Sequence, residues 1–420
     1  MAPRMCAAFW MPLGRAPVVK PLQGQALVWA MCIGQVGNLL PHVVVPAVMV
    51  QHLMPLWGMT HSQAGLLAAS YAAGYMLAVP LLSALTDRFD ARRILLRGSL
   101  CSALSTLAFA FMADSWFTGM LCWALAGASF AGAYMPGLRA LIDRLGNANA
   151  SRSITLYTSS YSMGVGFSFL ISQLVADAWG WRWSFGLTAM GPLVMAFVAW
   201  RMQPMTPVSV GGHLLDVRPV LRNRPAMAYI LSYGAHCFEL YGFRTWVVAF
   251  WTFVVARHQG AALPEPVVVS FLASLLAMPA SILGNEMSLR FGRIRAITWI
   301  QVASGVTALS VGFWAGGSAW VLLALILMYA VTVTADSGSL TAGMMSCAQP
   351  QFKGLTLAMH STVGFGLSAL SGWAMGLALD SQGGGQVPEA WMAAFGVLAV
   401  GVLLGPLALR LSKSPSAEVS

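Results

Sequence analysis

The sequence predicts an all-α membrane protein with twelve transmembrane helices. Of its 420 residues, 58% are hydrophobic and only 9% are charged, whereas a soluble globular chain carries roughly 25% charged residues. Apolar runs recur from end to end, and each is long enough to cross a hydrocarbon core, which takes about 20 helical residues. A transmembrane β-barrel would instead show alternating segments of roughly ten residues.

Twelve apolar segments account for the expected helices. They cover residues 26–50, 62–85, 94–113, 117–141, 153–177, 182–202, 226–256, 266–287, 294–315, 318–345, 355–379 and 389–411. The longest connection, residues 203–225, is polar, basic and rich in proline, which is typical of a linker. We therefore expect two six-helix bundles, at 26–202 and 226–411, with short tails at 1–25 and 412–420.

The basic residues predict the orientation of the chain. The formal net charge is +10, and most Lys and Arg residues fall in alternate short connections and in the tails. Basic connections are retained on the cytoplasmic side of a membrane. Both termini are thus expected in the cytoplasm, as in a multi-pass protein of the cell inner membrane. The same pattern argues against nucleic-acid binding, because topology already explains the positive charge.

The two halves show traces of an internal repeat. The fifth segment reads SYSMGVGFSFLIS from Ser160, and the eleventh reads HSTVGFGLSALSG from His360, an offset of 200 residues. Small residues recur there at every fourth position, as Ser160, Gly164, Ser168 and Ser172 in one and Gly364, Ser368, Gly372 and Gly376 in the other. Such ladders let helix backbones approach closely within lipid. Repeated halves around a central site are a transporter architecture.

The connection after the second segment reads LLSALTDRFDARRIL, from Leu81 to Leu95. It resembles the loop signature of the major facilitator superfamily, G-x-x-x-D-R-x-G-R-R. Four residues match that signature, namely Asp87, Arg88, Arg92 and Arg93. Ser83 and Asp90 stand where the superfamily usually has glycine.

The second half carries a degenerate copy of this signature, ILGNEMSLRFGRIRAI, with Arg290, Gly292 and Arg293. The GWRWSF stretch that starts at Gly180 is also similar to that superfamily. The resemblance covers the whole chain. It implies two pseudo-symmetric bundles that rock around one central site, with Asp87 and the signature arginines as a latch on the cytoplasmic side. The alternative for these charges is that they only set topology.

The seventh segment places charges inside the membrane. His236, Glu239 and Arg244 lie in the stretch HCFELYGFRTWVVAFW, and burying a charge without a partner is costly. Glu239 and Arg244 are five residues apart, so they do not pair well within one helix. Asp336 of the tenth segment is a candidate partner for Arg244 or His236. We expect Glu239 to be a proton-coupling acid, or these charges to form a static ion pair.

Further polar residues are expected to line a central cavity. Gln35, Asn38 and His42 follow i, i+3, i+7 spacing in the first segment, where Pro41 should loosen the helix. Tyr157 and His360 are further candidates for contact with solute or protons. Hydrogen bonding between helices is the alternative for each of them.

These features predict a proton-coupled secondary transporter of a small solute, acting as a monomer in the lipid bilayer. The sequence has no phosphate-binding G-x-x-x-x-G-K-[ST] loop, no hydrolase motif and no metal-ligand spacing, so we expect neither an enzyme nor a cofactor or metal. An uncoupled carrier of a small organic anion, with Arg244 as the anion site, remains open. So does a membrane receptor or assembly factor that no longer transports.

Overall fold

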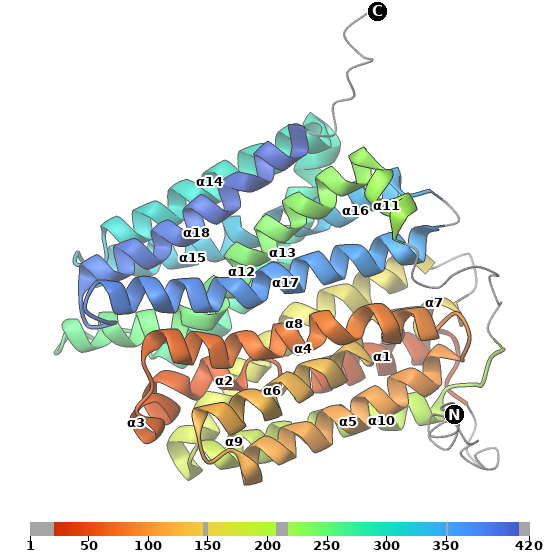
Figure 1. The fold of residues 1–420 in the computed structure, drawn as a ribbon, viewed down its shortest axis with the longest axis horizontal. Helices are drawn as coiled ribbons and strands as arrows, with labels where there is room; N and C mark the ends of the chain where they lie inside the picture. The colour runs from red at the N-terminus through yellow and green to blue at the C-terminus, as the bar shows by residue number, and fades with distance from the viewer. Residues whose placement is uncertain (1–20, 146–149, 207–216, 350–351, 411–420) are drawn as a thin grey trace, which may run out of the picture.

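A computed structural model of the chain describes residues 21–145, 150–206, 217–349 and 352–410. The described residues are almost entirely helical, which confirms the predicted all-α class (Figure 1). Most of the two predicted tails and the centre of the linker, residues 207–216, lie outside the described residues.

The helices before the linker form the part of the molecule that is here called the N-terminal half. They are α1 (Gly24–Asn38), α2 (Val44–Val48), η2 (Met49–Leu53), α3 (Met54–Trp57), α4 (His61–Leu85), α5 (Ala91–Met112), α6 (Trp116–Ala131), α7 (Tyr134–Ile142), α8 (Ala150–Trp179), α9 (Trp181–Thr188) and α10 (Gly191–Arg201).

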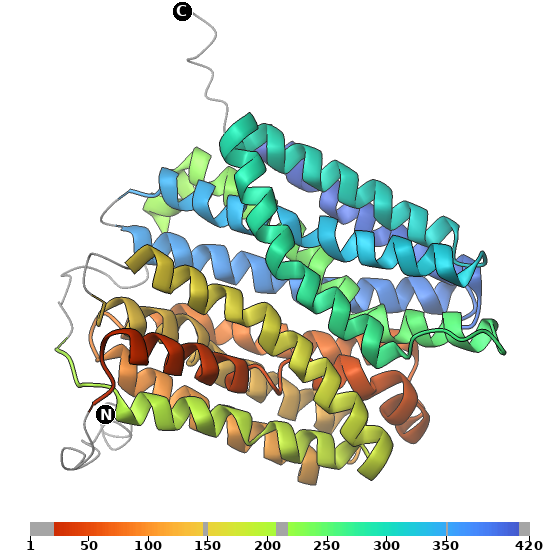
Figure 2. The same cartoon turned by 180° about the vertical axis from the view of Figure 1, so that it is seen from behind.

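The helices after the linker form the C-terminal half. They are α11 (Arg218–Arg222), α12 (Arg224–Arg257), α13 (Pro266–Phe291), α14 (Arg293–Phe313), α15 (Ala319–Ala335), α16 (Ser337–Cys347), α17 (Lys353–Ser381) and α18 (Pro388–Leu409). In Figure 1 this half lies above the N-terminal half, and α17 runs alongside α4 where the two halves meet. On the opposite face, shown in Figure 2, α8 and α13 make the corresponding contact.

Within the described residues, nine helices or helix pairs are long and apolar enough to cross a membrane. The helices α8 and α12 have 30 and 34 residues, which exceeds the length that a crossing needs, but they carry more polar side chains. The chain from α1 to α3 is apolar but interrupted. Together with the nine, α8, α12 and the segment from α1 to α3 would give the predicted twelve spans. That count stays a prediction.

Four predicted spans are interrupted rather than continuous. The first breaks after Asn38 and resumes at Val44, and Pro41 lies in the gap, where it cannot donate a helical hydrogen bond. The fourth consists of α6 and α7, the sixth of α9 and α10, and the tenth of α15 and α16. The break in the tenth span falls at Asp336, whose amide donates to the carbonyl of Thr334 rather than four residues back.

Small residues bring helices into backbone contact. A Cβ on Gly74 of α4 would lie 1.9 Å from the carbonyl oxygen of Ala124 in α6. Between the halves, a Cβ on Gly376 of α17 would lie 2.3 Å from the His61 carbonyl oxygen of α4. The eleventh-segment ladder therefore packs against α4, as expected of small residues in a membrane interface.

Both described chain ends lie on one side of the bundle: in Figure 1 the chain begins at the right, and α18 ends at the top. This side is here called the terminal side, and it contains the signature loop and the ends of the linker. The opposite side is called the far side. Exposed tryptophans mark both rims: Trp179, Trp183, Trp314 and Trp320 near the far side, and Trp29, Trp200 and Trp299 near the terminal side.

Candidate functional site

A chain of three polar side chains crosses between the halves at the centre of the molecule. The Tyr161 hydroxyl of α8 lies 2.8 Å from His42 Nε2 and 2.8 Å from the Tyr241 hydroxyl of α12. His42 lies in the turn between α1 and α2, so the break in the first span brings its ring to this position. The His42 ring also packs edge-on against the rings of both tyrosines. The halves are thus joined at mid-bundle by hydrogen bonds.

Arg244 lies beside this chain. Its guanidinium carbon is 5.8 Å from the ring centre of Tyr161 and 5.5 Å from that of Tyr241, within the range of cation–π attraction. The residue is 8% exposed, and among the described residues no carboxylate lies within salt-bridge distance of it. It lines a small cavity between α8, α12, α13 and α15. The other lining residues are Phe169, Leu240, Phe243, Val247, Ser270, Ala273, Ser274, Ala277, Ala330, Val333 and Thr334.

Asp336 pairs with His236 and not with Arg244. The distance from His236 Nδ1 to Asp336 Oδ1 is 2.7 Å, and both side chains are 2% exposed. Gln301 of α14 donates to the other carboxylate oxygen of Asp336 at 2.9 Å, and it also contacts the Ser232 hydroxyl of α12. This network lies inside the C-terminal half and joins its seventh, ninth and tenth spans.

Glu239 lies inside the same half, one turn along α12 from His236. Its carboxylate accepts a hydrogen bond of 2.7 Å from the Ser304 hydroxyl of α14. Glu239 is 1% exposed and does not line the cavity with Arg244. The two charges of the seventh span therefore face different surroundings, as their five-residue spacing implies.

His360 of α17 extends this cluster toward the other half. Its ring stacks on Tyr233 with 3.7 Å between ring centres, and Tyr233 also stacks on His236. Its Nε2 lies 3.4 Å from the Thr341 hydroxyl of α16. The imidazoles of His236 and His360 are thus connected through one tyrosine ring.

In the N-terminal half, Gln35 accepts a hydrogen bond of 2.8 Å from the Tyr157 hydroxyl. Within the part of the chain that the structure describes, the Gln35 amide nitrogen and both polar atoms of Asn38 have no hydrogen-bond partner, although both residues are almost fully buried. His42 Nδ1 is likewise without a partner. Leaving buried polar groups unpaired is costly, so this stripe is a place where water or solute would be favoured.

Comparison with known proteins decides the family. Residues 31–363 match the sequence profile of the Major Facilitator Superfamily. The chain belongs to the major facilitator superfamily. It is therefore a multi-pass membrane protein of a transporter superfamily and not one of an enzyme family.

The similar curated proteins come from Danio rerio. The chain is 24% identical to Protein spinster homolog 3 over 235 residues, which is 53% of this chain and 46% of the relative. It is 24% identical to Sphingosine-1-phosphate transporter SPNS2 over 282 residues, 63% of this chain and 52% of the relative. The matched region spans about half the length of these curated relatives.

Solved structures support the major facilitator fold. Two crystal structures of a bacterial homolog of the human lysosomal transporter Spinster, both inward-facing, resemble this chain. The occupied form has a TM-score of 0.66 at 16% identity, and the unoccupied form has 0.67 at 14% identity. Each comparison covers 92% of this chain and 94% of the other.

The superfamily's signature loop makes its contacts within the N-terminal half. Asp87 lies 3.7 Å from Arg139 of α7, which also pairs with Asp143 at 2.8 Å as their i, i+4 spacing predicts. Burial raises the pKa of Asp87 above its usual range, and nearby Asp143 adds to this while Arg139 opposes it. A raised pKa means that a proton binds Asp87 more readily here than in water.

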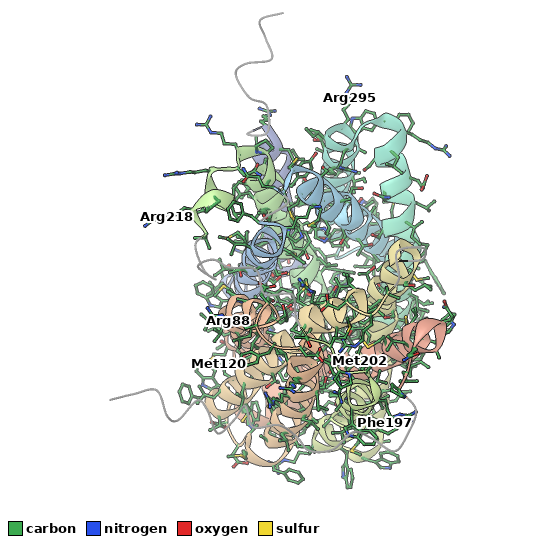
Figure 3. The ribbon with its side chains drawn as sticks, turned by 90° about the vertical axis from the view of Figure 1, so that its right-hand side faces the viewer. Arg88, Met120, Phe197, Met202, Arg218 and Arg295 are labelled. Carbon is green, nitrogen blue, oxygen red and sulfur yellow. The ribbon has the colours of Figure 1, made fainter. Side chains whose placement is uncertain are left out.

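The signature arginines differ in their surroundings. Arg92 donates to the carbonyl oxygens of Ala199 and Trp200 at the end of α10, at 2.8 and 2.9 Å. Arg293 of the degenerate copy donates to Ser346 of α16 at 3.3 Å. The remaining signature arginines are exposed: Arg88, Arg93 and Arg290. Figure 3 views the molecule from the terminal side and labels Arg88 there.

Asp90 is a residue whose importance the sequence analysis missed. It replaces the signature's second glycine, caps α5 by accepting from the Arg92 amide, and accepts two hydrogen bonds of 2.9 and 3.0 Å from Arg144. It also accepts from the Met205 amide at the start of the linker. An acidic residue directly before a helix is a signal for such a cap.

Asp380 was missed as well. This residue at the end of α17 accepts from the amides of His61 and Ser62 at the start of α4, at 3.0 and 2.8 Å, and from His61 Nδ1 at 2.9 Å. His61 Nε2 in turn accepts from the Gly385 amide. A carboxylate of one half thus binds a helix N-terminus of the other, where the helix dipole favours negative charge. Sequence alone does not show that these residues meet.

Proposed function

We propose that this protein moves a small amphipathic solute with an anionic group across the membrane by alternating access, driven by protons. The observation that carries the proposal is Arg244, a buried cation at the contact between the halves with no carboxylate partner among the described residues. We place the protein in the cytoplasmic membrane, as a monomer, with the terminal side in the cytoplasm.

The surroundings of Arg244 favour an anion as the group it binds. Two tyrosine rings lie within cation–π distance of its guanidinium, whose N–H donors match a planar or tetrahedral anion. A buried arginine without a carboxylate is costly, and a bound anion would remove that cost. A solute that supplies the missing charge therefore gains more from this site than a neutral one.

The rest of the cavity favours an apolar portion in the same solute. Its lining is mostly aliphatic and aromatic, with the hydroxyls of Ser270, Ser274 and Thr334 as exceptions. One curated relative is named a sphingosine-1-phosphate transporter. Sphingosine-1-phosphate is a lipid with an anionic head on an apolar chain. We therefore propose single-chain phospholipids as the first solutes to test.

The contacts between the halves suggest which state the structure represents. On the far side, Asp380 binds the start of α4, and Gln51 lies 3.4 Å from Thr252. On the terminal side, the contacts of Asp87, Asp90 and Arg293 stay within one half. We assign this arrangement to a state that is closed on the far side, from which the halves would rock apart to complete the cycle.

Proton coupling is favoured by the buried acids and bases of the C-terminal half. Glu239, His236 and Asp336 are all almost fully buried, and such groups in a transporter mark proton relays. An uncoupled organic-anion carrier would keep Arg244 as its binding residue but would not concentrate solute in response to a pH gradient.

Arg244→Gln and Arg244→Lys test the proposal in proteoliposomes given radiolabelled sphingosine-1-phosphate and an imposed pH gradient. We expect at least a tenfold loss of uptake in Arg244→Gln and a partial loss in Arg244→Lys, because lysine keeps the charge but not the planar donor set. Arg257→Gln, at the exposed end of the same helix, is the matched control.

Uptake by wild type that does not respond to the pH gradient would support the uncoupled carrier instead. Equal uptake by Arg244→Gln and wild type would contradict the assignment of the anion site. If wild type moves none of this lipid, an untargeted comparison of metabolites in cells with and without the protein decides between another solute and a non-transporting receptor.

A further inference from the structure

We propose that the His236–Asp336 pair is the proton-binding site of the transport cycle, and that it acts on the break between α15 and α16. This inference rests on the proposed proton-coupled function and identifies its coupling residues. The pair is chosen over Glu239 because of where its carboxylate lies in the backbone and what it contacts.

The position of Asp336 links its side chain to a joint in the tenth span. The residue itself forms the break, with φ −86° and ψ −14°, between Ala335 at the end of α15 and Ser337 at the start of α16. One carboxylate oxygen lies 2.7 Å from His236 Nδ1, at ion-pair distance but without hydrogen-bond geometry, and the other accepts a hydrogen bond of 2.9 Å from Gln301. A change at this carboxylate therefore acts directly on the angle between the two helix pieces.

The chemistry of the pair provides two states that differ by one proton. An imidazole beside a carboxylate has a net charge of −1, and an imidazolium beside a carboxylate has a net charge of zero. The two states therefore differ in the net charge that this buried position must hold, and isolated charge is costly away from water. Hydration of the pair in another conformation would allow the proton to leave.

Several titratable groups surround the His236–Asp336 pair. On α12 the neighbours are Tyr233, Cys237 and Glu239, and on α17 His360, while α14 contributes the neutral amide of Gln301. Tyr329 of α15 interacts with Glu239. Arg244 lies farther along α12 and faces the tyrosines of the central contact. Glu239 has no ionic partner among the described residues and accepts from Ser304 on a helix without a break.

A path leads from the break to the contact between the halves. A Cβ on Gly284 of α13 would lie 1.9 Å from the Ala335 carbonyl oxygen, so α13 packs directly on the break. The Ser288 and Ser339 hydroxyls, 2.7 Å apart, tie α13 to α16. On its other side α13 meets α8 of the N-terminal half, where Gln173 donates to Ser270 at 2.9 Å (Figure 2). Bending at Asp336 thus has a packed route to the opposite half.

The first test needs no solute. Spin labels at Arg88→Cys and Arg295→Cys, which lie on the two halves at the terminal side in Figure 3, report their separation in lipid as pH changes. We expect the distance distribution to shift as the pH is lowered, because the pair takes up a proton. Asp336→Asn and His236→Gln should each abolish the shift, and Glu239→Gln, the matched buried carboxyl, should retain it.

The second test separates coupling from a structural role. In proteoliposomes with sphingosine-1-phosphate, Asp336→Asn should keep solute exchange at equal pH but lose accumulation driven by a pH gradient. Infrared pH titration should show a carboxyl or imidazole band that disappears in Asp336→Asn and His236→Gln. If Asp336→Asn loses both solute exchange and pH-driven accumulation but keeps the wild-type titration band, Asp336 has a structural role and the proposal is overturned.

The remaining outcomes are also decisive. If Glu239→Gln, and not Asp336→Asn, removes the pH-dependent shift, the coupling acid is Glu239 and the proposal is wrong. If wild type shows neither a titrating band nor a pH-dependent distance, proton coupling itself fails, and with it that part of the proposed function. If wild type responds to pH but does not move the lipid, only the solute was chosen wrongly.

Discussion

At the residue scale, Asp90 is the acid on which several elements of the terminal side converge. Its side chain and that of Arg144 are only 7% and 5% exposed, and the same carboxylate holds the start of α5 and the first residues of the linker. This chain has Asp90 where the signature loop usually has glycine, and the aspartate forms a buried ion pair that the glycine could not form. The loop follows the superfamily in position but is fixed by different contacts.

We expect Asp90→Ala to lower thermal stability strongly, because it leaves Arg144 buried without its partner. Removing one member of a buried ion pair typically costs about 3–5 kcal/mol. The measurement is thermal unfolding in one detergent. Asp114→Ala, which removes an exposed pair with Arg182, is the control and should change stability by no more than about 1 kcal/mol. Similar losses in both variants would contradict the anchoring role.

Sequence reasoning identified the kinds of residue in the candidate site better than their partners. The polar residues of the first and seventh segments were predicted to face the interior, because exposure to lipid would be costly. Whether Asp336 would meet His236 or Arg244 could not be decided, because each lies about a hundred residues away in sequence. Only the packing of α12 against the broken tenth span brings one of the two to Asp336.

At the element scale, the sequence predicts the break in the first span more clearly than the break in the tenth. The break in the first span was expected from Pro41, whose missing N–H leaves a gap in the helical ladder. The break at Asp336 has no proline and occurs in the stretch ADSGS, where small polar residues only weaken a helix. The break packs against Gly284 and lies in close contact with His236, and neither contact can be read from local sequence.

Close contact between α4 and α6 gives a prediction about packing. The variant Gly74→Ala should reduce folded yield and stability, because its Cβ would lie 1.9 Å from a backbone oxygen that cannot move alone. Overpacking of this kind costs about 1–3 kcal/mol. The yield of monodisperse protein after size-exclusion chromatography and its unfolding temperature measure the effect.

The matched control for that substitution is Gly396→Ala in α18, where an added Cβ meets nothing within 4 Å. Alanine favours a helix by up to about 1 kcal/mol over glycine, so this control should be neutral or stabilising. If both substitutions behave alike, the close approach of α4 and α6 does not limit stability.

At the scale of the whole molecule, Asp380 makes a polar contact that joins the two halves on the far side. It uses a carboxylate of α17 to bind the start of α4, while a related contact between His52 and Asp177 stays within the N-terminal half. We expect Asp380→Asn to shift the population toward conformations with the far side open, since the neutral amide binds a helix N-terminus less well.

Spin labels at Asp114→Cys and Ser318→Cys, exposed positions on the far side of the two halves, measure this shift. The native cysteines are replaced beforehand. Asp380→Asn should add a population at longer distance, and Asp177→Asn should not. An unchanged distribution in Asp380→Asn would show that apolar packing alone keeps the far side closed.

The overall architecture could be predicted, whereas the side on which polar contacts join the two halves could not. Hydropathy, the linker and the signature loop indicated an all-α membrane protein of the observed family. The same sequence must also form the other states of a transport cycle, so no residue pattern selects one of them. The contacts of His61 and Asp380 join positions more than three hundred residues apart.

The tryptophans at the two rims bear on how this molecule sits in its membrane. Indole rings prefer the level of the lipid headgroups, so two rows of them fix the thickness of hydrocarbon that the protein matches. Rocking of the halves would carry Trp179 and Trp314, on opposite halves, through this layer together with their helices. The lipid chain length then becomes part of the energetics of opening, because a bilayer that fits one state must be deformed to accommodate the other.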